Sequence, residues 1–253
     1  IKRLNGKIHE AHDSLMMIAE DSTDYYGTTK PLWANGLGFD YKWDLGWMND
    51  TLKYMGYDPV YRQYHHGLMT FSMAYFYAER FILPFSHDEV VHSKGTIIDK
   101  INGDFEMKFK QLRTLYVYMM SHPGKKLNFM GNEFGHPEWI DFPREGNGWS
   151  HKHARRQWNL VDNKELCYHY LGDFDKEMIH LLRSVKDLQD TPVIEIWHND
   201  GDQVLAYRRK NLIFVFNFHP NKSFTDYGFL VPTGAYDVVL NTDNPDFGGF
   251  GSS

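Results

Sequence analysis

The chain has 253 residues, 42% of them hydrophobic, which indicates a globular protein with a substantial buried core. Its formal net charge of −6 disfavours nucleic acid as a partner, because nucleic-acid binders usually carry a basic patch that neutralises phosphates. The single cysteine, Cys167, excludes an internal disulfide framework, and no apolar run reaches the roughly 20 residues needed to cross a membrane. No secretory signal precedes the first predicted strand, so we expect a cytoplasmic protein.

The first segment of interest is an apolar run that ends abruptly at a carboxylate. Residues 2–13 are mostly polar and predict the end of a surface helix, and residues 15–19 predict a strand. Glu20 follows this strand directly, with Asp21 after it. A strand of an α/β barrel brings a catalytic acid to the open end of the barrel in this way.

Predicted strands and helices then alternate along the chain. Strands are expected at residues 39–43, 81–85 and 127–130, helices at residues 47–55, 68–78 and 105–121, and a loop at residues 61–66. Within the last of these helices, Phe105, Phe109 and Leu112 recur at spacings of three and four. The alternation predicts an α/β fold with a parallel sheet, namely the C-terminal half of a (β/α)8 TIM-type barrel.

The hydrophobic pattern of the sequence changes after a long loop at residues 134–163 and a predicted helix at residues 168–188. Short apolar runs at residues 193–197, 203–208 and 212–218, parted by turn residues, predict antiparallel strands, and residues 238–240 are strand-like. We therefore predict two domains, the half-barrel at residues 1–188 and a truncated antiparallel β-sandwich at residues 189–253. Both ends of the chain suggest a piece of a longer polypeptide.

Two carboxylates at strand ends suggest sugar chemistry. After five apolar residues, Glu20 can be partly desolvated, which favours a general acid for a glycosidic oxygen. Asp88 follows the strand at residues 81–85 and can stabilise positive charge on a sugar ring, while the adjacent His87 can bind sugar hydroxyls. Taken singly, Glu20 could be an ordinary exposed residue and Asp88 an ordinary helix cap.

Other polar residues raise two questions, namely whether the chain binds a metal ion and where a substrate groove lies. His87 and His92 are five residues apart, whereas a helical zinc pair needs a spacing of four, so we predict no metal site. Glu133 and Trp139 lie after the fourth predicted strand, on the side where barrel active sites lie, and are candidates for a glucan groove. Loop aromatic residues more often close over the edge of a core.

Four stretches together resemble glycogen branching enzymes of the α-amylase superfamily. These are MIAEDST (17–23), GLGFDYKWDLGWMNDTL (36–52), LPFSHDEVVHSKGT (83–96), and the stretch from HPGKKLNFMGNEFG to HKHARRQW (122–158). SHDEVVH and GWMNDTL distinguish branching enzymes from hydrolytic amylases, whereas a strand-end Glu and a His-Asp pair occur across the superfamily. The match covers most of the chain.

The resemblance implies a retaining transferase that cuts an α-1,4-glucan, holds the piece covalently and passes it to a 6-hydroxyl. It implies Glu20 as acid/base, Asp88 as transition-state stabiliser and His87 as a ligand of the sugar hydroxyls. We further predict that Asp21, Glu133 and Trp139 bind substrate. The resemblance also implies an α-glucan partner and no metal or organic cofactor. The oligomeric state is left open.

One departure from the family concerns the nucleophile. The family's nucleophilic Asp follows the fourth barrel strand in an Arg-x-Asp setting, and that strand is expected before Ile1. The fragment alone should therefore be inactive. A hydrolytic α-amylase-type enzyme and a non-catalytic glucan-binding remnant are the alternatives.

Overall fold

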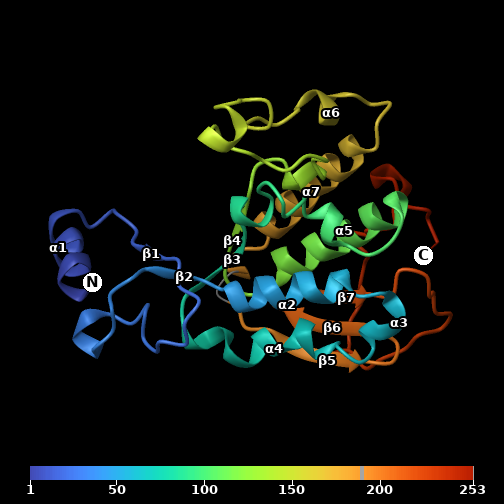
Figure 1. The fold of residues 1–253 in the computed structure, drawn as a ribbon. Coiled ribbons are helices and arrows are strands. Elements are labelled where there is room, and N and C mark those ends of the chain that lie inside the picture. Colours follow the sequence, from blue (N-terminus) through green and yellow to red (C-terminus); the bar gives the residue numbers. More distant parts are fainter. Residues whose placement is uncertain (189–190, 253) are drawn as a thin grey trace.

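The computed structural model describes residues 1–188 and 191–252. A parallel sheet with its helices forms the first part of the chain, and a three-stranded antiparallel sheet forms the second (Figure 1). Residues 189 and 190, at the predicted domain boundary, lie outside the described residues, as does residue 253.

The first sheet contains four strands in the order β1-β2-β3-β4, and every neighbouring pair is parallel. The strands are β1 (Ile18–Ala19), β2 (Tyr41–Trp43), β3 (Phe81–Phe85) and β4 (Lys125–Asn128). All five residues of β3 are buried, as expected for a parallel strand with both faces covered. The predicted parallel sheet is confirmed, and its carboxyl edge receives the residues that follow β1 and β3.

Seven α-helices occur among the described residues, and none is long and apolar enough to cross a membrane. They are α1 (Lys2–Ala11), α2 (Leu45–Gly56), α3 (Pro59–Arg62), α4 (Gly67–Tyr75), α5 (Phe105–Ser121), α6 (Asn159–Asp162) and α7 (Tyr168–Ser184). The side chain of Asp104 caps α5 by accepting a hydrogen bond from Met107 N at 2.8 Å. The bounds predicted for this helix are confirmed.

Several local predictions are wrong. Part of the loop expected at residues 61–66 belongs to α3, where Asp58 caps the helix and Pro59 occupies its first turn. Strand β4 begins and ends two residues earlier than expected, because its register with β3 ends at the pair Phe85 and Asn128. Helix α7 ends at Ser184 rather than at residue 188.

The second sheet is antiparallel and contains β5 (Ile194–Asn199), β6 (Val204–Arg209) and β7 (Leu212–Asn217). The three predicted strands are thus confirmed. The strand expected at residues 238–240 is absent, and Val238 there is 85% exposed. Within residues 191–252 these strands form a single sheet, so the expected sandwich lacks a second layer of strands.

Helix α5 takes the place of a second layer against the antiparallel sheet. The rings of Tyr118 on α5 and Phe216 on β7 meet edge to face with centroids 5.9 Å apart. The hydroxyls of Ser121 and Tyr207 lie 2.6 Å apart. Buried side chains from both parts of the chain share one hydrophobic core. The antiparallel sheet is therefore packed firmly against the helices of the parallel part (Figure 1).

Buried arginines also join the two parts by donating hydrogen bonds to backbone carbonyls. Arg113 on α5 donates from Nε to the carbonyl of Thr242 at 2.7 Å. Arg209 on β6 donates from Nη1 to the carbonyl of Ser121 at 2.8 Å. Since a guanidinium offers five donors, each arginine can satisfy several buried carbonyls at once.

Candidate functional site

Glu20 lies at the carboxyl edge of the parallel sheet, directly after β1. The desolvation expected for it is wrong, because Glu20 is exposed. The apolar residues before it are exposed as well, Leu15 at 50% and Met16 at 66%. Only Ala19 of this run is buried, since β1 is a two-residue strand with a single neighbour in the sheet. Glu20 is thus free to meet a ligand, in a setting open to water.

Asp21 is held by the chain itself. Its carboxylate pairs with Lys42 Nζ of β2 at 3.0 Å and accepts hydrogen bonds from the amide and hydroxyl of Thr23 at 3.1 and 2.9 Å. Burial raises the pKa of Asp21, but the hydrogen bonds from Lys42 and Thr23 outweigh burial and hold the pKa below its ordinary value. Asp21 therefore fixes the turn after Glu20, and its role in substrate binding stays a prediction.

His87 and Asp88 follow β3 in a short 3-10 helix (His87–Glu89). The hydroxyl of Ser86 accepts a hydrogen bond from the Asp88 amide at 3.1 Å and so caps this turn. His87 Nε2 and Asp88 Oδ1 are 3.5 Å apart, and both side chains are 44% exposed. That separation is too long for a strong hydrogen bond, so both groups can turn toward a ligand.

A cavity of about 380 Å³ lies beside His87. Its other walls come from the segments after β4: Phe129, Met130, Ile140, Phe142, and residues 154–156. Cavities of this size fall within the range of small-molecule sites. The phenyl rings and the imidazole offer flat faces for sugar rings, and Arg155 offers an exposed cation.

Arg156 holds the wall of this cavity in place. It is 7% exposed, and it donates from Nε to the Met130 carbonyl at 2.7 Å and from Nη1 to the Glu138 carbonyl at 3.2 Å. Its guanidinium carbon lies 5.0 Å from the centre of the Phe129 ring. The ARRQW run lay inside the stretch that resembles branching enzymes, but the sequence offered no sign that this arginine contacts residues 26 positions earlier.

Glu133 lies in the turn after β4, where its carboxylate accepts a hydrogen bond from the Gly131 amide at 2.6 Å. Asp175 of α7 is a neighbour that sequence reasoning missed. Burial, and next the negative charge of Glu133, raise the pKa of Asp175 to about 7. A single acid on an amphipathic helix carries no sequence signal for such a pairing, which only the packing of α7 creates.

Trp139 is 37% exposed and lies between two imidazoles. It stacks on His153 with centroids 5.6 Å apart and meets His92 edge to face at 6.1 Å. Its indole thus packs in a local aromatic cluster with His92 and His153 and remains partly exposed to solvent.

The six predicted site residues fall into separate groups. His87 and Asp88 are adjacent, and His87 borders the cavity. No hydrogen bond, ion pair or ring contact within residues 1–188 and 191–252 joins Glu20 to Asp88, or either acid to Glu133 or Trp139. No group of three or more His, Cys, Asp or Glu side chains in the described part of the chain is arranged to hold a metal ion.

Both parts of the chain are similar to known proteins. Residues 195–253 match the family described as alpha amylase, C-terminal all-beta domain. The 1,4-alpha-glucan branching enzyme GlgB of Francisella tularensis subsp. novicida (strain U112) is 39% identical to this chain over 273 residues, which cover 99% of the chain and 39% of that enzyme. The chain is homologous to a segment of branching enzymes.

A second relative gives the same result, and the predicted resemblance is confirmed. The 1,4-alpha-glucan branching enzyme GlgB of Halothermothrix orenii is 42% identical over 264 residues, covering 99% of this chain and 40% of that enzyme. The chain thus spans about two fifths of the length of these branching enzymes.

Solved structures resemble the fold. A cyclomaltodextrinase superposes with a TM-score of 0.56 at 16% identity, over 85% of this chain and 34% of that one. Ttha1563 from Thermus thermophilus superposes with a TM-score of 0.54 at 16% identity, over 85% of this chain and 44% of that one. At this level of identity the likeness concerns the fold alone.

Proposed function

We propose that this chain belongs to a 1,4-α-glucan branching enzyme and supplies its acid/base and its transition-state stabiliser. The carrying observation is that Glu20 directly follows strand β1 and Asp88 lies in the turn after strand β3, at one edge of a parallel sheet, in a chain homologous to branching enzymes over 99% of its length. Residues at the carboxyl ends of parallel strands are the usual source of catalytic groups in such folds.

In this proposal Glu20 first protonates the glycosidic oxygen of an α-1,4 link while a nucleophilic carboxylate bonds to C1 of the cleaved sugar. Glu20 then takes the proton of an acceptor 6-hydroxyl as that oxygen attacks C1 and releases the nucleophile. Asp88 stabilises the positive charge that develops at C1 in both steps. The nucleophile is an Asp that residues 1–253 do not supply.

The same proposal assigns the remaining residues. His87 binds hydroxyls of the sugar being cleaved, and the cavity beside it receives part of the glucan. Asp21 holds the turn that contains Glu20 and contributes to substrate binding. Glu133 and Trp139 line the glucan groove at a greater distance from the reacting link. No cofactor enters this reaction scheme.

The fold proposal is that β1 to β4 are the last strands of a (β/α)8 barrel, with residues 1–188 as its C-terminal half and residues 189–253 as the all-β domain. In support, the sheet is parallel throughout, and within residues 1–188 and 191–252 its edge strands β1 and β4 each have one neighbour. A barrel satisfies such edges by closing the sheet. We further propose glycogen synthesis in the cytoplasm as the setting.

Incubation of the full-length enzyme with amylose tests the function. Proton NMR of the product distinguishes new α-1,6 links from new reducing ends. Branching predicts α-1,6 links formed with little increase in reducing ends, whereas a hydrolytic amylase produces reducing ends only. Maltooligosaccharide binding with neither product would instead support a non-catalytic glucan-binding protein, and residues 1–253 alone should form no α-1,6 links.

A further inference from the structure

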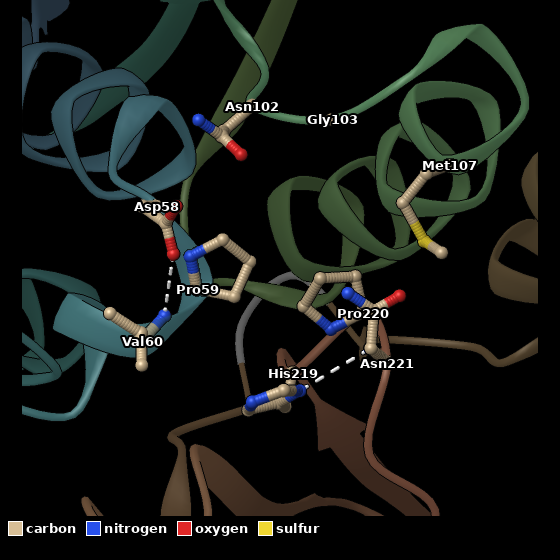
Figure 2. A pocket seen from close by; sticks show the side chains of 9 residues that line it. All are labelled: Asp58, Pro59, Val60, Asn102, Gly103, Met107, His219, Pro220 and Asn221. Atoms are coloured by element: carbon tan, nitrogen blue, oxygen red, sulfur yellow. Dashed lines mark hydrogen bonds between the residues drawn. The ribbon is translucent and has the colours of Figure 1, made fainter.

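A second cavity lies where the parallel part of the chain meets the antiparallel sheet (Figure 2). We call it the junction pocket. Its volume is about 320 Å³, and it is lined by residues 58–60, by Asn102, Gly103 and Met107, and by residues 219–221. It shares no lining residue with the cavity beside His87.

Two of its three walls are held from behind by buried glutamines. Gln203, 2% exposed, donates from Nε2 to the Pro59 carbonyl at 2.6 Å. Gln111, 5% exposed, donates from Nε2 to the Asn102 carbonyl at 2.7 Å. A buried amide placed on each backbone segment fixes the position of the pocket wall.

The third wall is held by a buried arginine. Arg62 is fully buried and donates from Nη1 to the carbonyl of Phe218 at 3.0 Å, directly before His219. All three segments are therefore fixed before any ligand arrives. Such preorganisation lowers the entropic cost of binding.

The lining suits a hydroxyl-rich ligand. It contains no Lys or Arg, and its carboxylate, Asp58, accepts a hydrogen bond from the Val60 amide at 3.0 Å, so an anion is disfavoured. The carboxamides of Asn102 and Asn221 have no hydrogen-bond partner within residues 1–188 and 191–252, and both are drawn beside the open space in Figure 2. The rings of Pro59 and Pro220 supply apolar surface between these polar groups.

His219 adds a hydrogen-bond donor of fixed position. Burial, and next the charges of Lys222 and Arg62, lower the pKa of His219, so its imidazole is neutral at pH 7. Its Nδ1 accepts a hydrogen bond from the backbone N–H of Asn221 at 3.3 Å, which leaves the proton on Nε2. Carboxamides, a neutral imidazole and apolar rings together match the hydroxyls and C–H faces of a sugar.

We propose that the junction pocket binds a short stretch of the α-glucan at a position separate from the reacting link. This rests on the proposed function for the identity of the sugar. The pocket would keep a long glucan on the enzyme while the chain is cut and transferred elsewhere.

The test is titration of the 253-residue chain with maltoheptaose, followed by NMR of the side-chain amides of asparagine. Saturable shifts of the Asn102 and Asn221 amide signals are expected. The double variant Asn102→Ala, Asn221→Ala should weaken the corresponding binding phase at least tenfold, and Val60→Trp, which fills the pocket without removing a polar group, should do the same. Asn49→Ala, an exposed asparagine on α2, is the matched control and should leave binding unchanged.

The outcomes separate this proposal from the function. Asparagine signals that stay unmoved, or both pocket variants binding as the control does, would overturn the junction pocket even if the full-length enzyme branches amylose normally. Equal shifts with cellohexaose would overturn its assignment to an α-glucan. Absence of branching by the full-length enzyme would overturn the proposed function, while the pocket would still be judged by its own shifts.

Discussion

Similar apolar runs have different surroundings in an edge strand and in an interior strand of the parallel sheet. In β3 every residue from Phe81 to Phe85 is buried, because β2 and β4 flank the strand and helices cover it. In the run before Glu20, Leu15 and Met16 are exposed, and β1 pairs only with β2. A hydrophobic pattern becomes a complete strand only where neighbours supply hydrogen bonds and cover.

The largest expected effect concerns the two carboxylates that these regions deliver. Glu20→Gln or Asp88→Asn in the full-length enzyme should lower the branching rate roughly a thousandfold, because each removes a charge or proton used only in the transition state. Initial rates of α-1,6 link formation from amylose measure this. Retained maltooligosaccharide binding is the control. Near-normal branching by either variant would contradict the catalytic role proposed for that residue.

Two substitutions, one in the core and one in the exposed run, test this comparison through their effects on the free energy of unfolding. Trp47 is 1% exposed, and its ring lies 5.1 Å from that of Phe85 on β3. Trp47→Ala should lower the free energy of unfolding by about 3–5 kcal/mol, because it leaves a large cavity. Leu15→Ala, at the exposed run, should change it by less than about 0.5 kcal/mol. Urea denaturation of the 253-residue chain compares them, and similar losses for both would contradict the contrast between the two runs.

The contact between helix α5 and the segment after β7 offers a third measurement. Arg113→Ala removes the hydrogen bonds that α5 donates to the carbonyls of Thr242 and Gly248. We expect a loss of about 3 kcal/mol, since buried carbonyls then lack partners. Arg155→Ala, an exposed arginine, is the matched control and should be nearly neutral. An Arg113 variant as stable as the control would show that the segment after β7 adds little to the fold.

The smallest effect is a pH dependence near β4. The pKa of Asp175 is raised from 3.8 to about 7, so its contribution to stability is fully present below pH 3.8 and is lost as the pH rises through 7. Asp175→Asn should therefore be more stable than the parent chain by about 2 kcal/mol at pH 8, with the difference shrinking toward pH 4. Thermal or urea unfolding at both pH values measures it, and a difference independent of pH would contradict the raised pKa.

Much of the fold could be predicted because local signals agreed with one another. Helix α5 has apolar residues at helical spacing, Asp104 as its cap and Pro123 after its end, and its predicted bounds were confirmed. The places of Glu20 and Asp88 after strands were readable for the same reason. Helix α3 was missed although Asp58 and Pro59 signal a helix start, because four residues carry too little periodicity.

By itself, the sequence determined most of the longer strands and helices, which acids follow the strands, and the resemblance to branching enzymes, because periodicity, caps and short motifs are local properties. Only the tertiary structure decided that Glu20 is exposed, that Arg156 walls the cavity beside His87, and that buried glutamines and arginines hold the junction pocket. These depend on contacts such as Arg62 with Phe218, 156 residues apart, and such pairings leave no local pattern.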